Sequence, residues 1–409
     1  MERFGLIGYP LKHSFSPKIH KRLGSWPYEL HPLQPEELGP FLQAGEFSGL
    51  NVTLPYKTAV IPYCTELSPI AQRIGSVNTI LRRPDGTLYG HNTDYDGLRG
   101  LLEQAGLARE FMGRKVLVLG SGGASLTART VAQDFGAGEV VVISRSGPDH
   151  YGNLDRHADA RFILNTTPVG MYPNTGKAPL DLKLFPLCRG VCDIVYNPAR
   201  TQLMLDAQRL DIPAVGGLGM LVGQAKAAAE LFLDQTLESG LVSSITREIQ
   251  NETENMVLIG MPGCGKSTVG RALADRTGRR LVDIDQELER ELGCTIPDFF
   301  AQKGEAAFRQ AESRMLAQFC RESGLVIACG GGAVTVPENI GVMRQNGRLI
   351  YLRRPLEELP IEGRPVSQSR PLEELFAQRR PLYESAADIT VDNVQVEQAA
   401  ADIWKEWTR

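Results

Sequence analysis

The chain has 409 residues, which is long enough for two or three domains with separate cores. Charged residues make up 22% of it and the formal net charge is −4, so nothing in the composition points to nucleic acid as a partner. No apolar run approaches the roughly 18 residues of a membrane span, which argues against a membrane partner. The seven cysteines are scattered without metal-like spacing, which indicates reduced thiols and predicts a cytoplasmic protein.

The first hundred residues contain several short polar segments at the ends of apolar stretches. A strand over residues 4–7 runs into a loop rich in hydroxyl groups, which contains Ser14 and Ser16. Such a loop suits a carboxylate, although a plain turn is the alternative interpretation of the loop taken alone. Strand ends are where ligands commonly meet a sheet, so we treat these segments as one candidate substrate site. The other segments of that site carry Thr53, Lys57, Asn78 and Asp94.

Two residues of this candidate site, Lys57 and Asp94, have opposite charges. A cation–carboxylate pair can pass one proton to a reacting carbonyl group, so the pair is a candidate for general acid–base catalysis. A surface salt bridge is the alternative interpretation.

Residues 115–143 have the pattern of a dinucleotide-binding unit. The apolar run 115–119 is typical of a buried parallel strand, residues 126–135 have helical composition, and residues 139–143 form a second apolar strand. Ser125 stands where the usual fingerprint has its third glycine, so the pattern is a variant of the Rossmann fingerprint. The residues of this turn that we expect at the cofactor are Gly120, Ser121, Gly122, Gly123 and Ala124.

The end of the second strand indicates which dinucleotide binds. An NAD site places Asp or Glu there, whereas this strand ends in Ser144 and Arg145. A guanidinium pairs bidentately with a 2′-phosphate, which favours NADP, and a solvent-facing arginine is the alternative. Only residues 146–160 separate this strand from the next, which leaves too little chain for a full helix and strand.

Together these motifs resemble those of shikimate dehydrogenase over about residues 3–240. Matching segments continue at 165–171, 192–198 and 216–224. The resemblance implies an NADP(H)-binding Rossmann domain beside a substrate domain, with Lys57 and Asp94 as the catalytic pair. It places Ser14, Ser16, Thr53 and Tyr196 at the substrate carboxylate, and Asn78 and Gln224 with the catalytic pair at the ring oxygens. It also places Gly217 and Met220 beside the nicotinamide.

Residues 260–268 match the phosphate-binding loop pattern, with an apolar strand before the loop and a helical stretch after it. Its glycines let backbone N–H groups close around phosphate oxygens, Lys266 adds positive charge, and Ser267 offers a hydroxyl to Mg²⁺. The loop therefore predicts ATP and Mg²⁺ as cofactors. The residues that we expect at the nucleotide are Gly263, Cys264, Gly265, Lys266, Ser267 and Thr268.

Further candidate residues follow the loop. Asp283 and Asp285 occupy alternate positions at an expected strand end, so we expect them on opposite faces with different tasks. Arg309 lies near the start of a predicted helix, and Arg380 precedes the last predicted strand. A third strand runs into a bare backbone that allows close ligand approach, formed by Gly330, Gly331 and Gly332.

This ordered set resembles shikimate kinase across about residues 255–409. The resemblance implies that Arg309 and Arg380 hold the substrate carboxylate, and that the three glycines cover the ring. Asp285 would hold the ring hydroxyls and act as base, and Asp283 would join Ser267 around Mg²⁺. The family has a mobile lid where residues 353–368 are short and interrupted by prolines. The lid arginine that reaches ATP is matched by Arg364, with Arg370 as a second candidate.

We therefore expect an α/β protein with three domains. A discontinuous substrate domain covers residues 1–98 and 220–240, a Rossmann NADP-binding domain covers 99–219, and a P-loop kinase domain with a parallel sheet covers 255–409. A polar linker at 241–254, without a docking surface, joins the 220–240 segment of the substrate domain to the kinase domain.

The predicted function is NADPH-dependent reduction of 3-dehydroshikimate to shikimate, followed by ATP-dependent phosphorylation to shikimate 3-phosphate. Both substrates are small molecules, and the oligomeric state stays open. One alternative is a quinate/shikimate dehydrogenase with broader NAD use. The other is a regulatory sensor that binds these ligands without turnover.

Overall fold

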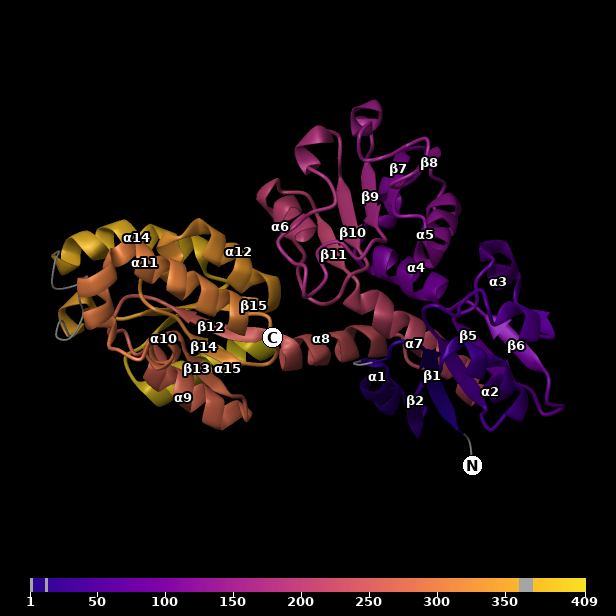
Figure 1. Ribbon diagram of the computed structural model, residues 1–409, viewed down its shortest axis with the longest axis horizontal. Coiled ribbons are helices and arrows are strands. Elements are labelled where there is room, and N and C mark those ends of the chain that lie inside the picture. Colours follow the sequence, from indigo (N-terminus) through magenta and orange to yellow (C-terminus); the bar gives the residue numbers. More distant parts are fainter. Residues whose placement is uncertain (1–2, 12–13, 360–370) are drawn as a thin grey trace. The chain divides into compact units, whose positions relative to one another are not determined.

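The computed structural model describes residues 3–11, 14–359 and 371–409. The chain divides into two compact α/β units, whose helices flank their sheets (Figure 1). Unit 1 comprises residues 1–170, 177–196 and 206–248. Unit 2 comprises residues 171–176, 197–205 and 249–409.

The first sheet of unit 1 has six strands in the order β2-β1-β3-β5-β6-β4. Strand β1 runs parallel to β2 and β3, whereas β5 is antiparallel to both of its neighbours. Its strands are β1 (Phe4–Gly8), β2 (Tyr28–Pro32), β3 (Gly49–Val52), β4 (Glu66–Leu67), β5 (Thr79–Arg82) and β6 (Leu88–His91). Its helices are α1 (Ser16–Leu23), α2 (Leu38–Ala44) and α3 (Pro69–Ile74). The polar segments predicted to bind substrate lie at the ends of β1, β3 and β6, and just before β5.

The second sheet of unit 1 is fully parallel, in the order β11-β10-β9-β7-β8. Its elements are β7 (Lys115–Leu119), α5 (Gly123–Asp134), β8 (Glu139–Ile143), β9 (Phe162–Asn165), β10 (Gly190–Asp193), α6 (Gln202–Arg209) and β11 (Ala214–Gly216). The residues of β7 after Lys115 are completely buried, as expected for a central parallel strand. Only a short 3₁₀ helix, Leu154–His157, separates β8 from β9, which confirms that this Rossmann unit is trimmed.

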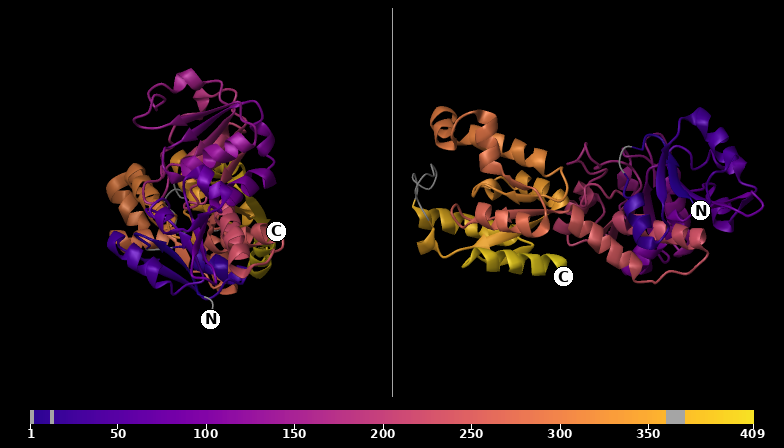
Figure 2. Two further views of the ribbon diagram at one scale, coloured as in Figure 1. Left: turned by 90° about the vertical axis from the view of Figure 1, so that its right-hand side faces the viewer. Right: turned by 90° about the horizontal axis from the view of Figure 1, so that it is seen from below.

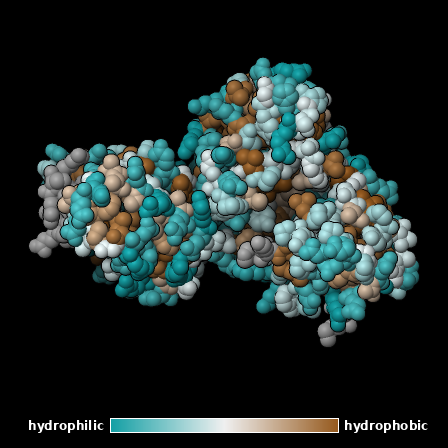
Figure 3. Space-filling view, in the orientation of Figure 1, coloured by the Kyte–Doolittle hydropathy of each residue, from teal (hydrophilic) through white to brown (hydrophobic). Residues whose placement is uncertain are grey.

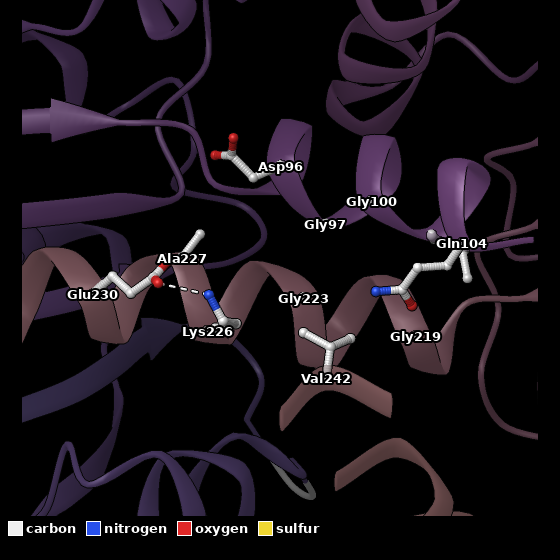
Figure 4. A pocket seen from close by; sticks show the side chains of 11 residues that line it. Asp96, Gly97, Gly100, Gln104, Gly219, Gly223, Lys226, Ala227, Glu230 and Val242 are labelled. Atoms are coloured by element: carbon white, nitrogen blue, oxygen red, sulfur yellow. Dashed lines mark hydrogen bonds and ion pairs between the residues drawn. The ribbon is translucent and has the colours of Figure 1, made fainter. Parts of the chain in front are cut away.

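Two helices connect the sheets of unit 1, α4 (Asp94–Gln104) and α7 (Leu218–Leu233). They cross in backbone contact, because a methyl group on Gly97 would lie 2.5 Å from the Met220 carbonyl oxygen and 2.8 Å from the Gln224 nitrogen. The close-up in Figure 4 shows this crossing beside a pocket, in which Lys226 and Glu230 pair at 2.6 Å. The close crossing brings the start of α4 next to the middle of α7.

Unit 2 is built on a parallel sheet in the order β13-β14-β12-β15-β16. Its strands are β12 (Asn255–Ile259), β13 (Leu281–Asp283), β14 (Val326–Ala328), β15 (Gly347–Arg353) and β16 (Ile389–Asp392). Its helices are α9 (Lys266–Thr277), α10 (Ile284–Leu292), α11 (Ile296–Phe319), α12 (Pro337–Asn346), α14 (Leu372–Ala386) and α15 (Val396–Thr408). Helices α9 and α15 pack against each other, as do α11 and α12, and helices cover both faces of the sheet (Figure 2).

The segment predicted to be a polar linker is a helix, α8 (Leu241–Thr253). Ile245 and Ile249 lie one turn apart on one face of α8, and they are 2% and 1% exposed. Within unit 1, Glu248 of this helix also pairs with Arg22 at 2.8 Å. The apolar residues at 241, 245 and 249 follow helical spacing, which was the signal for this helix in the sequence.

On the face seen in Figure 3, hydrophilic residues predominate and hydrophobic ones form small scattered groups. Among the described residues, no helix combines the length and the apolar composition needed to cross a membrane.

Candidate active sites

The first site contains a close cation–carboxylate pair. Lys57 follows β3 and Asp94 begins α4, and Lys57 Nζ lies 2.5 Å from Asp94 Oδ2. The two side chains are only 18% and 12% exposed, so this pair is not a surface salt bridge. Asp94 also lies in the first turn of its helix, where the helix dipole favours a negative charge. The arrangement can hold a proton beside a bound ligand.

Two buried amides lie beside this pair. Asn78 Nδ2 donates to Gln224 Oε1 at 3.5 Å, and Gln224 Nε2 donates to the Leu221 carbonyl at 2.8 Å. Asn78 and Gln224 are 2% and 8% exposed. Gln224 is held on α7 directly opposite Gly97 of α4, so the close helix crossing joins this amide to the element that carries Asp94.

The residues predicted to bind a carboxylate gather at the end of β1. Ser16 N donates to Ser14 Oγ, and Ser14 Oγ donates to Ser16 Oγ, both at 3.1 Å. The ring of Phe15 contacts that of Tyr196, with centroids 5.9 Å apart. Thr53 packs against the end of β1, where a methyl group on Gly8 would overlap its Cγ2. These hydroxyl groups can hydrogen-bond a carboxylate at this strand end.

The predicted dinucleotide site has an open turn before α5. Gly122 is the N-cap of α5, and a methyl group on Gly122 or Gly123 would meet nothing within 4 Å. A phosphate can therefore reach the N-terminus of this helix. The neighbouring residues Gly120, Ser121 and Ala124 complete the turn.

The other cofactor residues differ in exposure. Arg145 is exposed beyond the end of β8, next to Ser144. Gly217 caps α7 so closely that a methyl group there would overlap the Ile194 carbonyl oxygen. Met220 is 8% exposed and lies in the hydrophobic cluster that contains Leu98. Its side chain therefore belongs largely to the core, which differs from the expected position beside a cofactor.

The second site lies in unit 2, around the loop between β12 and α9. Gly265 has φ +95° at the N-cap of α9, a conformation that favours glycine. Lys266 Nζ is buried and donates to the carbonyls of Gly260 and Met261, both at 2.9 Å. Asn393 supports the loop by donating to the Cys264 carbonyl at 2.7 Å. The Cys264 side chain is completely buried, so only its backbone can contact a ligand.

The two aspartates of this site do not alternate on a strand, and that prediction is wrong. Strand β13 ends at Asp283, which is the N-cap of α10 and accepts hydrogen bonds from the Asp285 and Gln286 nitrogens. Asp285 therefore lies in the first turn of a helix. The other Asp283 oxygen accepts a hydrogen bond from Ser267, so the two residues predicted to hold a metal are in direct contact.

Asp285 lies close to a second carboxylate. Burial, followed by the nearby negative charge of Glu312, raises the pKa of Asp285 to about 6. Burial also raises the pKa of Glu312, against the neighbouring charge of Arg309. Arg309 Nη1 donates to Glu312 Oε2 at 2.6 Å.

The three glycines form the wall on which these charged groups meet. A methyl group on Gly330 would overlap Glu312 Oε1 and would lie 2.9 Å from Asp285 Oδ1. A methyl group on Gly332 would overlap the Arg309 guanidinium, and one on Gly331 would lie 2.5 Å from Pro262 of the phosphate-binding loop. The wall therefore brings the loop, the two carboxylates and Arg309 together in one site.

Arg380 does not reach this site. Its side chain is 57% exposed and pairs with Glu384 at 2.8 Å. The adjacent Arg379 is 4% exposed, hydrogen-bonds Tyr383 and places its positive charge near Glu312. Successive residues of a helix point in different directions, so only one of the two arginines can face the site. The predicted lid arginines, Arg364 and Arg370, lie outside the described residues.

Sequence reasoning missed Glu312 and Arg379, although both left a signal. Arg379 stands four residues after Leu375 and four before Tyr383, which is the spacing of one buried helix face. Glu312 likewise stands among the buried residues of α11. A charged residue at a core-facing helix position is uncommon, and it marks a site when other charged groups surround it.

Comparisons with known proteins identify the family of each part of the chain. Residues 6–80 match the family described as "Shikimate dehydrogenase substrate binding domain", and residues 262–407 match the family described as "Shikimate kinase". A shikimate dehydrogenase (NADP(+)) of Clostridium beijerinckii is 32% identical over 271 residues, which cover 62% of this chain and 99% of that protein. The chain belongs to the shikimate dehydrogenase family. Its C-terminal part is a shikimate kinase domain, so the protein is a bifunctional shikimate-pathway enzyme.

Solved structures support the assignment of the dehydrogenase part. Shikimate dehydrogenase 1 from Peptoclostridium difficile has a TM-score of 0.56 and 35% identity, and it covers 61% of this chain and 98% of its own. The Thermus thermophilus shikimate 5-dehydrogenase, solved with NADP(H) and shikimate, has a TM-score of 0.54 and 32% identity, covering 61% and 99%. The predicted family, the α/β fold class and the bifunctional enzyme class are confirmed.

Proposed function

We propose that unit 1 reduces 3-dehydroshikimate to shikimate with NADPH, and that unit 2 phosphorylates the 3-hydroxyl of shikimate with ATP. Two observations carry the proposal: the buried Lys57–Asp94 pair in unit 1, and the meeting of Asp285, Glu312 and Arg309 on the glycine wall in unit 2. Both substrates are small molecules, and we infer that the enzyme works in the cytoplasm. We also retain the domain limits 1–98 with 220–240, 99–219 and 255–409, with α8 in place of the linker.

In the dehydrogenase site, Lys57 is the group that donates a proton to the ketone oxygen. Asp94 holds the ammonium group 2.5 Å away and keeps its charge balanced in the buried cleft. Asn78 and Gln224 orient the ring through its oxygens, while Ser14, Ser16, Thr53 and Tyr196 bind the carboxylate. NADPH supplies the hydride when it is bound.

The turn before α5 fits the pyrophosphate of NADP, because both Gly122 and Gly123 leave open space at the helix N-terminus. The exposed Arg145 fits a 2′-phosphate at the end of β8. Ser144 and Gly217 complete this site in our assignment. Met220 would border the nicotinamide only through the small part of its side chain that is exposed.

In the kinase site, Asp285 holds the acceptor hydroxyl and accepts its proton. A pKa of about 6 suits this task, because the carboxylate is ionised at neutral pH yet basic enough to accept a proton. Lys266 binds the phosphates, which positions them and neutralises charge as phosphoryl transfer requires. Arg309 and Arg379, rather than Arg380, bind the carboxylate of shikimate.

The site also fits Mg²⁺. No cluster of three or more His, Cys, Asp or Glu side chains that could hold a metal occurs in the described part of the chain. Mg²⁺ is usually held by one or two protein ligands together with substrate phosphates, and Ser267 with Asp283 matches that pattern. The metal would neutralise phosphate charge beside Lys266.

Two activity assays on three proteins test the proposal. The purified full chain is assayed with shikimate plus NADP, and separately with shikimate plus ATP and Mg²⁺, alongside the variants Lys57→Ala and Lys266→Ala. Each variant should lose one activity and keep the other. Binding of both ligands without turnover in the unmodified chain would instead support a regulatory sensor. Equal turnover of quinate with NAD would support the broader dehydrogenase.

A further inference from the structure

A row of buried polar side chains leads to Asn78 of the proposed substrate site. The row contains residues that play no part in the proposed chemistry. Its members are Tyr28, Asn51, Thr79, Asn78 and Thr93. All are at most 4% exposed. Buried polar groups must be hydrogen-bonded or they destabilise the fold, so the direction of each bond in the row matters.

The direction can be fixed from the Asn78 end. The backbone N–H of Thr93 can only donate, and it lies 2.7 Å from one side-chain atom of Asn78. That atom is therefore Oδ1, and it also accepts from the Thr79 hydroxyl at 3.0 Å. The Nδ2 of Asn78 consequently points the other way, toward Gln224 Oε1.

The same reasoning fixes Asn51. Its Nδ2 faces the Asn78 backbone carbonyl at 3.5 Å, which can only accept, and it also donates to Thr79 Oγ1 at 3.2 Å. The Oδ1 of Asn51 therefore accepts from the Tyr28 hydroxyl at 2.8 Å.

The bonds then form one directed chain. Tyr28 donates to Asn51, Asn51 to Thr79, and Thr79 to Asn78. The chain ends at the amide that we assign to the ring oxygens. The Thr93 hydroxyl lies 3.0 Å from Thr79 Oγ1 and 3.2 Å from Asn78 Oδ1, so it also supports this end of the chain.

We propose that Thr79 is a positioning residue, supported by Asn51 and Tyr28. It holds the Asn78 side chain so that the NH₂ group of Asn78 faces the substrate. The inference rests on the proposed function of Asn78. Asn78 then acts on the ring as a hydrogen-bond donor, whereas Gln224, whose Nε2 is used by a backbone carbonyl, acts as an acceptor. This pair therefore fits a ring oxygen that accepts a hydrogen bond from Asn78 and a ring hydroxyl that donates one to Gln224.

The test is a double-mutant cycle between Thr79 and Asn78 in the full chain. Thr79→Val replaces the hydroxyl by a methyl group and should raise the KM for shikimate roughly fivefold, the weight of one hydrogen bond. The KM for NADP should stay within about twofold. Thr79→Ser, which keeps the hydroxyl, should restore the KM. In an Asn78→Ala background, Thr79→Val should have no further effect, because the group that it positions is gone.

Two further variants complete the design. Thr130→Val removes another buried threonine hydroxyl of unit 1, which bonds only to the Leu126 carbonyl of its own helix, and it should leave the KM unchanged. Tyr28→Phe breaks the chain further from Asn78 and should raise the KM by a smaller factor, even if Thr79→Val does not fold.

The outcomes separate the two levels of inference. An unchanged KM in both Thr79→Val and Tyr28→Phe would overturn the positioning role. An equal rise of the KM with and without Asn78 would also overturn it, since the effect would then be structural. If Asn78→Ala itself leaves the KM unchanged, the proposed role of Asn78 is wrong and the inference falls with it.

Discussion

The two active sites of the chain hold buried charge in opposite ways. In unit 1, Lys57 and Asp94 carry opposite charges 2.5 Å apart, so their attraction offsets the cost of burial. In unit 2, Asp285 and Glu312 are both carboxylates, and both lie against the backbone of Gly330. Their proximity, added to burial, keeps the pKa of Asp285 at about 6.

The difference follows the chemistry proposed for each site. A group that donates a proton to a ketone must stay charged at rest, and a neighbouring carboxylate stabilises that charged form. A group that accepts a proton from a hydroxyl must be basic, and burial beside a like charge makes a carboxylate more basic. Breaking each arrangement should therefore affect stability with opposite signs.

Removing the lysine should have the largest effect. Lys57→Ala should lower the rate of ketone reduction by a factor of about 10² or more, the usual weight of a proton-transfer group. It should also destabilise unit 1, because Asp94 is left buried without its partner. Steady-state assays of both activities and a thermal melt check this, with kinase activity as the internal control. Unaltered reduction would remove Lys57 from the mechanism.

Neutralising Asp285 should lower the kinase activity while it raises the stability of unit 2. Asp285→Asn should lower phosphoryl transfer by a factor of about 10² or more, while ATP still binds. The same change should stabilise unit 2 by about 2–3 kcal/mol above pH 7, because it removes a carboxylate whose pKa is raised to about 6.

The pH dependence gives the sign of that stability effect. A carboxyl group with a raised pKa in the folded state favours folding below its unfolded pKa of about 3.8, and this contribution is lost as the pH rises through about 6. The difference between Asp285→Asn and the unmodified chain should therefore be largest above pH 7 and small near pH 4. Denaturant titrations at both pH values measure it, and a pH-independent difference would contradict this origin.

The neighbouring arginines provide a matched pair. Arg379→Ala should raise the KM for shikimate in the kinase assay by about 10- to 100-fold, because a charge-assisted hydrogen bond to the carboxylate is lost. Arg380→Ala changes only an exposed pair with Glu384 and should stay within about twofold. If Arg380→Ala raised the KM for shikimate more than Arg379→Ala did, the sequence-based assignment of Arg380 to the carboxylate would be right.

Cofactor choice should show the smallest effect. NADP should exceed NAD in kcat/KM by more than about tenfold, or roughly 1.4 kcal/mol. Arg145→Ala should narrow this gap mainly through the KM for NADP, while the exposed Arg189→Ala serves as the control. Equal use of NAD and NADP by the unmodified chain would contradict the role of Arg145.

Most of the fold could be predicted from the sequence, because its signals are local. Glycine-rich turns between apolar strands and helical stretches predicted where the dinucleotide and phosphate loops lie. Lys57 and Asp94 were found because each ends a recognisable strand or begins a helix. The α8 helix was not predicted, because its polar residues outnumber the buried positions Ile245 and Ile249.

Side-chain direction was harder to predict. Adjacent arginines at 379 and 380 cannot be told apart by motif order, and only the buried face of α14 decides between them. Asp283 and Asp285 were placed on a strand because β13 ends earlier than its composition suggests. The Asp283 cap starts the helix at that point.

The glycine crossing of α4 and α7 has a consequence for how this enzyme can change over evolution. Gly97 touches no proposed ligand, yet its backbone lies against that of α7, so even alanine has no room there. Gly100, one turn further along the same helix, has nothing within 4 Å of a would-be methyl group. Two glycines on one helix are thus under different constraints: Gly100 can accept a side chain, whereas Gly97 is fixed by a backbone contact with a helix distant in the sequence.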